Sequence, residues 1–182
     1  MKVLLGVALA LVLGGAASAQ APTAQNDPAA PINNGGPSGP PGHDPVAKGL
    51  TADQALTVAK AAVAGCAEFH IGIAILDQAG LPKLYYVPDG TAGFHAYTAF
   101  RKANTAYLIK APSEDIRARM AADPEIAAKV KSGNAYLYFP GGLPIMKGGE
   151  MIGAIGISGA EPGGNDKKCA TAGLKAIADQ LQ

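Results

Sequence analysis

Regular hydrophobic spacing in the middle of the chain predicts a helix followed by two strands. Thr51 and Gln54 form a capping-box pattern, and the apolar positions after them recur at helical spacing as far as Cys66. Residues 68–77 alternate, with Ile71, Ile73 and Ile75 on one face and Gly72 and Ala74 on the other. A strand with one small face suits a helix that packs closely on it. A second strand is predicted over 84–87.

The pattern further along the chain predicts more helices and a third strand. A long helix is predicted over 94–110, and two short helices follow, one from Ser113 and one capped by Asp123. Residues 136–139 are predicted to form the third strand. Asn165-Asp166 is the predicted cap of a C-terminal helix. Four apolar positions form its stripe: Ala170, Leu174, Ile177 and Leu181.

Glycines dominate the stretch 141–160, which supplies the fourth and fifth strands. Lys147-Gly148-Gly149-Glu150 lies between two apolar runs and predicts a tight hairpin, because both central glycines can adopt positive φ. Gly153, Gly156 and Gly159 would weaken a strand unless other backbone packs close against it. The order helix, two strands, helices, three strands, helix predicts an α+β domain with a mainly antiparallel sheet.

Two segments resemble motifs of the haem-degrading/haem-binding protein family. One is the glycine-rich stretch 141–160, and the other is the helical segment 100–106, which carries the pattern Lys-Ala-x-Thr-Ala. This family also includes a protein of glycolate-utilisation operons and the C-terminal domain of some corrinoid adenosyltransferases. The resemblance extends over the region 50–182. It implies a profilin-like, five-stranded sheet with the first and last helices packed on one face.

The N-terminal part of the chain has the pattern of a targeting segment. Residues 1–19 have the charge, apolar run and Ala-x-Ala ending of a signal peptide, so cleavage is expected before Gln20. The apolar run is shorter than the about 20 residues of a membrane span. Residues 20–48 are rich in Pro, Gly and Ala and predict a disordered linker. The chain is therefore expected to be exported to the periplasm or secreted, without a stable membrane anchor, with residues 49–182 as its single domain.

Composition and motifs argue against several functions. The formal charge is +1 with no basic cluster, which argues against nucleic acid as a partner. No phosphate-binding glycine loop is present, and Ser158 lacks the second glycine of a nucleophile elbow, so it is interpreted as a buried or strand-end hydroxyl. The three histidines and two cysteines form no pair with metal-ligand spacing. Without a catalytic constellation, a binding protein is expected rather than an enzyme.

The candidate binding residues cluster at the start of the helix 94–110. An imidazole or a tyrosinate can ligate haem iron, so His95 is the first candidate ligand and Tyr97 the substitute. Phe94, with Tyr85 and Tyr86, would cover the porphyrin, and Arg101 or Lys102 would pair with a propionate. Alternatively, His95 caps the helix or faces solvent, and the two basic residues are solvated.

A disulfide between Cys66 and Cys169 is expected from export together with the resemblance. Exported proteins keep disulfides, and the chain has two cysteines. The resemblance implies that the first and last strands are antiparallel neighbours, which would bring the two cysteines to the same face of the sheet. The alternative is a pair of buried free thiols.

Three functions remain open at this stage. The resemblance implies an exported haem-binding homo-oligomer that stores, senses or degrades haem. It also implies, through the glycolate-operon relatives, an enzyme or accessory protein that acts on a small carboxylate such as a 2-hydroxy acid. The third possibility is a partner module that binds no small ligand.

Overall fold

The computed structural model describes residues 49–162 and 164–182, which form an α+β domain. The elements are α1 (Ala52–Ala64), β1 (Gly72–Leu76), β2 (Pro82–Tyr86), α2 (Phe94–Ile109), η2 (Ser113–Asp115), α3 (Ile116–Ala122), α4 (Pro124–Lys131), β3 (Gly142–Lys147), β4 (Glu150–Ser158), α5 (Asn165–Lys175) and η3 (Ala178–Gln180). The predicted signal peptide (1–19) and linker (20–48) lie outside the described residues. No helix within the described ranges is long and apolar enough to cross a membrane.

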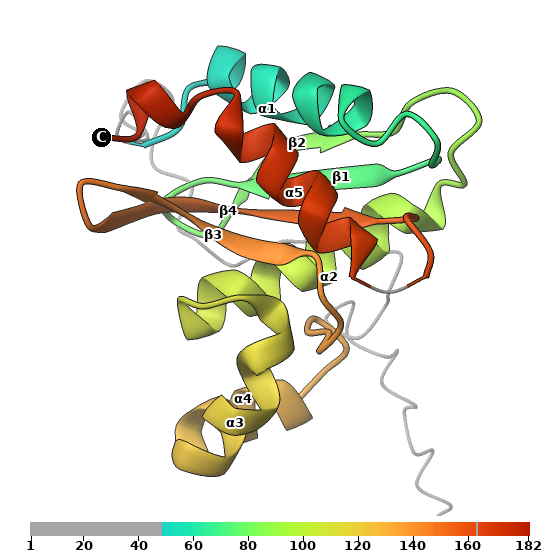
Figure 1. Ribbon diagram of the computed structural model, residues 1–182. Coiled ribbons are helices and arrows are strands. Elements are labelled where there is room, and N and C mark those ends of the chain that lie inside the picture. The colour runs from blue at the N-terminus through green and yellow to red at the C-terminus, as the bar shows by residue number, and fades with distance from the viewer. Residues whose placement is uncertain (1–48, 163) are drawn as a thin grey trace, which may run out of the picture. The chain divides into compact units, whose positions relative to one another are not determined.

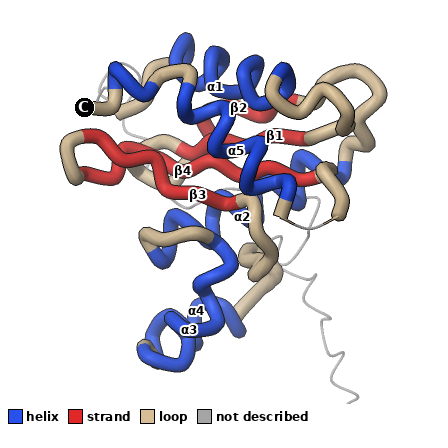
Figure 2. Tube along the Cα trace, in the orientation of Figure 1, coloured by secondary structure: helices blue, strands red, loops and turns tan. Residues whose placement is uncertain are grey.

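The strands form one antiparallel sheet in the order β2-β1-β4-β3 (Figures 1 and 2). The first and last strands, β1 and β4, are neighbours in this sheet, as the resemblance implied. The predicted hairpin joins β3 to β4, with Lys147 paired to Glu150. Gly148 and Gly149 have φ of 53° and 85°, which is the backbone that the pair of glycines predicted.

The two faces of β1 differ in side-chain size, and each face receives different helices. Ile73 and Ile75 belong to the large core cluster that α1 and α5 cover, whereas Ala74 faces α2. Figure 1 shows α1 and α5 on one side of the sheet and α2 on the other. A Cβ atom on Gly72 would lie only 2.7 Å from the backbone nitrogen of Ala96. The small face therefore serves the close helix packing that the sequence predicted.

Glycine in β4 permits the same close approach. A Cβ on Gly156 would overlap the carbonyl oxygen of Ala99 in α2, and one on Gly153 would overlap the carbonyl oxygen of Leu76. The predicted reason for glycine in this strand, close packing of other backbone, is thus confirmed.

The predicted third strand over 136–139 is wrong, and the sheet formed by the described residues has four strands rather than five. The backbone groups of this segment bond to side chains instead of to a neighbouring strand. The amide of Leu137 donates to Thr105 Oγ1 at 2.8 Å, the carbonyl of Tyr136 accepts from Arg101, and the carbonyl of Phe139 accepts from Ser113. These backbone groups already have hydrogen-bond partners, so they are satisfied without pairing to a neighbouring strand.

Two of the three predicted helix caps are confirmed. Thr51 forms a complete capping box with Gln54, and Asp123 accepts hydrogen bonds from the first amides of α4. The prediction for α5 is wrong, because its N-cap is Gly164 and no side chain caps it. The carboxylate of Asp166 binds partners elsewhere. In addition, α5 ends at Lys175, so the last two residues of the predicted stripe lie beyond the helix.

The Cys66–Cys169 disulfide is present and confirms the expected pairing. The two Cα atoms are 5.8 Å apart, and the bond links the chain just after α1 to α5. Small residues allow these helices to approach, since a Cβ on Gly173 would lie 2.7 Å from the carbonyl oxygen of Val58. Both sulfurs are buried in the core on this face of the sheet.

Candidate functional site

His95 lies in the first turn of α2, beside the end of β4. Its Nδ1 atom is 3.1 Å from the hydroxyl oxygen of Ser158, which is only 6 % exposed. The Phe94 ring lies next to the imidazole, with 4.1 Å between the ring centroids. Among the described residues, Nε2 of His95 takes part in no hydrogen bond or ion pair. The imidazole is therefore held through Nδ1, and Nε2 has no partner among the described residues.

Three aromatic side chains near the start of α2 remain substantially exposed. Phe94 is 65 % exposed, Tyr97 44 % and Tyr85 43 %. Tyr85 reaches the α2 side of the sheet, where its ring centroid is 6.1 Å from that of Phe100. Burial raises the pKa of the Tyr85 phenol, so this side chain is neutral near pH 7 and a poor source of tyrosinate. Phe94 and Tyr97 thus expose apolar ring surface in the first turn of α2, and Tyr85 does so beside Phe100, one turn further along.

Tyr86 does not join this group. It faces the opposite side of the sheet, where it packs against the core covered by α1 and α5. Successive side chains on a strand point to opposite faces, so Tyr85 and Tyr86 cannot both line one site.

Arg101 lies one turn of α2 beyond Tyr97 and is fixed beside it. Its Nη2 atom donates to the carbonyl oxygen of Tyr136 at 2.8 Å, and its guanidinium carbon lies 5.9 Å from the centroid of the Tyr97 ring. Its Nε atom is buried and has no hydrogen-bond partner in the described structure. The side chain places a permanent positive charge next to the exposed rings.

Lys102 is placed differently from Arg101. It is 3 % exposed, and its Nζ atom donates to Asp166 Oδ2 at 2.6 Å in a buried ion pair. The other carboxylate oxygen of Asp166 accepts the backbone N–H of Ala160 at 2.9 Å. The amino group of Lys102 is thus already paired with Asp166 inside the protein. The prediction that Lys102 binds a propionate is therefore not carried further, and Arg101 is the remaining candidate.

Sequence reasoning missed the roles of Ser158 and Asp166. Ser158 is buried at the end of β4, as interpreted, but its contact with His95 spans 63 residues of sequence. Asp166 meets Lys102 across 64 residues. No local spacing signals such pairs, because they depend on how α2 lies across the sheet.

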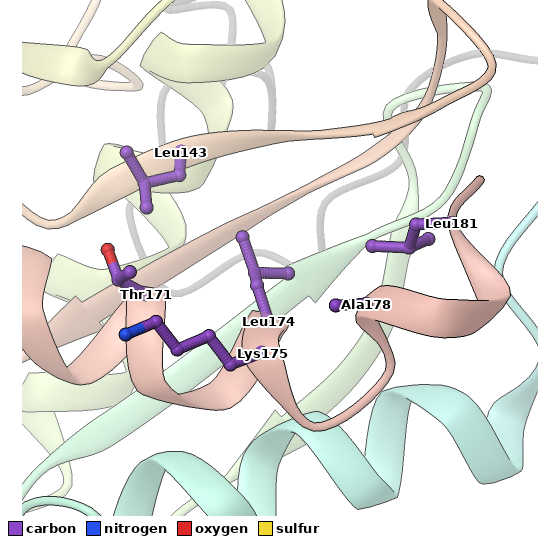
Figure 3. A pocket seen from close by; sticks show the side chains of 6 residues that line it. All are labelled: Leu143, Thr171, Leu174, Lys175, Ala178 and Leu181. Carbon is purple, nitrogen blue, oxygen red and sulfur yellow. The ribbon is translucent and has the colours of Figure 1, made fainter.

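A separate groove of about 310 Å³ lies between α5, η3 and β3 (Figure 3). Six side chains line it: Leu143, Thr171, Leu174, Lys175, Ala178 and Leu181. The lining is mainly aliphatic and contains no histidine or tyrosine, so it offers none of the ligands considered for haem iron. The described residues also contain no cluster of three or more histidine, cysteine or acidic side chains that could hold a metal ion.

The fold and this site define an antiparallel-sheet α+β domain in which His95, held by Ser158, lies beside the exposed ring of Phe94. Residues 50–175 match the model of the HbpS-like haem degrading proteins. This match covers more than half of the sequence, and the chain belongs to that family. A comparison with curated proteins found no match.

Solved structures share the fold. HbpS from Streptomyces reticuli, solved as a double mutant, is 28 % identical, with a TM-score of 0.63 over 77 % of this chain and 94 % of that one. The ORFY protein of Klebsiella pneumoniae is 21 % identical, with a TM-score of 0.63 over 75 % of this chain and 95 % of that one. PduOC, solved in complex with heme, is 21 % identical, with a TM-score of 0.61 over 71 % and 95 %. At 21 % identity the last two show the fold alone.

Proposed function

We propose that this domain binds haem on the surface at the start of α2. The observation that carries the proposal is the imidazole of His95, which contacts Ser158 through Nδ1, keeps Nε2 without a partner among the described residues, and lies beside the exposed ring of Phe94. Membership of a family described as haem degrading supports the choice of ligand, as does the heme complex of a protein with the same fold.

The residues present fit the chemistry of haem. His95 would ligate the iron through Nε2. Tyr97, the predicted substitute ligand, stands two residues further along α2, where side chains do not face each other, so it would serve only a haem bound on its own side of the helix. The exposed rings of Phe94 and Tyr85 would cover apolar porphyrin surface, and Arg101 would pair with a propionate. Bound haem would supply a redox-active iron, while the protein contributes placement and access.

Haemin binding to the purified protein tests this proposal. Increasing haemin should give a saturable, shifted Soret band in the wild type, and His95→Ala should change its position or weaken binding. His70→Ala is the matched control, because His70 is the other histidine among the described residues, is exposed, and lies with its ring against Gly90 rather than in α2. A loss of binding in the control together with normal binding by His95→Ala would discard the assigned ligand. Non-saturating spectra with the wild type would discard haem and favour a small carboxylate that binds at Arg101.

We also propose that the protein acts outside the cytoplasm. Residues 1–19 have the pattern of a signal peptide, and the disulfide suits an oxidising compartment. Intact-mass measurement of the protein from an exporting host should find a chain that begins at Gln20. A full-length product retained in the membrane would refute this proposal.

A further inference from the structure

Ser158 reaches His95 because β4 carries no side chain at the position before it on the same face. Residues 156 and 158 point to the α2 side of the sheet, since side chains alternate along a strand. Gly156 lets the backbone of α2 lie against β4 at Ala99. This close contact brings the first turn of the helix, with His95, within 3.1 Å of the Ser158 hydroxyl.

A second set of hydrogen bonds connects the end of β4 to α2, two residues beyond Ser158. The backbone N–H of Ala160 donates to Asp166, and Asp166 is paired with Lys102 of α2. The strand end is therefore attached to α2 at two points, directly through His95 and indirectly through Lys102. The connection through Lys102 and Asp166 is buried and the contact between Ser158 and His95 is partly buried, so the Ser158 hydroxyl has a defined position relative to the imidazole.

We propose that Ser158 is a positioning residue that makes Nε2 the iron-ligating nitrogen of His95. This inference rests on the proposed haem function. A neutral imidazole carries one proton, and only its unprotonated nitrogen can bind a metal. When Nδ1–H donates to the Ser158 oxygen, the lone pair lies on Nε2. A serine hydroxyl can donate as well as accept, and the proposal assigns Ser158 the acceptor role in its 3.1 Å contact with Nδ1. In that role the hydroxyl stabilises the ligating tautomer and fixes the ring orientation, as outer-shell partners of metal-bound histidines do.

The tautomer can be measured without haem. Long-range ¹H–¹⁵N correlation spectra distinguish protonated from unprotonated ring nitrogens. They are recorded on the haem-free protein at a pH at which an ordinary histidine side chain is neutral. We expect Nδ1 of His95 to be protonated in the wild type, and Ser158→Ala to shift the population toward protonated Nε2. An unprotonated Nδ1 in the wild type would overturn the inference, and so would an unchanged tautomer in Ser158→Ala. The wild-type measurement requires no variant to fold.

Haemin binding supplies the second readout. Ser158→Ala should weaken binding by about 10–100-fold, the usual effect of losing such a partner, and Ser158→Thr should restore it because the hydroxyl returns. In the double variant with His95→Ala, the serine substitution should have no additional effect. Equal losses with and without His95 would show that Ser158 acts by another route and would overturn the inference.

Different results would refute the haem-binding proposal and the proposed role of Ser158. Wild-type affinity in His95→Ala would refute the proposed iron ligand, whatever the tautomer of the haem-free protein. If His95 is required but Ser158→Ala binds haemin as tightly as the wild type, the haem proposal stands and the role of Ser158 is wrong.

Discussion

Reduction of the Cys66–Cys169 disulfide should remove a large part of the stability of the domain. The bond joins residues 103 apart in sequence, so it closes a loop that contains most of the described residues. In the chain-entropy model, a loop of about 100 residues restricts the unfolded chain by about 4.7 kcal/mol at 25 °C. A small protein has a total unfolding free energy of about 5–15 kcal/mol, so the expected loss is a substantial fraction of the whole.

Urea unfolding with and without a thiol reductant measures this loss. With an m-value of about 2 kcal/mol/M, the midpoint should fall by about 2 M on reduction. The reduced wild type keeps both sulfur atoms and therefore isolates the effect of the covalent bond. The double variant Cys66→Ala/Cys169→Ala should be at most as stable as the reduced wild type, because it also loses buried volume. Coincident midpoints for the oxidised and reduced proteins would refute the reasoning.

Two further substitutions test the packing around α2, each by urea unfolding. Gly156→Ala places a methyl group against the carbonyl oxygen of Ala99 and should cost about 1–3 kcal/mol. Gly133→Ala has open space around its new Cβ and should change stability by less than about 0.5 kcal/mol; equal effects would contradict the predicted clash. Lys102→Met leaves the buried carboxylate of Asp166 unpaired and should cost about 3–5 kcal/mol. Combining it with Asp166→Asn removes that charge but keeps an acceptor oxygen, so most of the loss should be recovered. A double variant as unstable as Lys102→Met would show that the unpaired charge is not the cause.

The elements that the sequence predicted correctly depend on short-range rules. The capping box at Thr51 and the cap at Asp123 are formed by side chains that bond to amides two or three residues away. The hairpin at Gly148 and Gly149 follows from the backbone freedom of those two residues. The small face of β1 indicated that a helix would pack closely on it. In each case a few consecutive residues contain the whole physical cause.

Segment 136–139 shows where such rules fail. Its alternating aromatic residues are typical of a strand, yet its amide and carbonyl groups bond to side chains of α2 and η2. A strand requires a neighbouring strand with free backbone groups, and α2 occupies the space around this segment instead. Only the tertiary arrangement decides which partner a backbone group obtains.

The candidate site divides in the same way. The sequence by itself grouped residues that are close along the chain into one cluster at the helix start: Tyr85, Tyr86, Phe94, His95, Tyr97 and Arg101. The fold removes Tyr86 from this cluster, because it faces the other side of the sheet. The sequence could not distinguish Arg101 from Lys102, since both occupy the same helix and carry the same charge. The fold separates them. Arg101 turns toward the exposed ring of Tyr97. Lys102 is buried and pairs with Asp166 of α5, which lies 64 residues further along the chain. Ser158 becomes the partner of His95 only because Gly156 lets α2 lie against β4. The glycine predicted that some backbone packs against this strand, but only the fold decides that this backbone is α2.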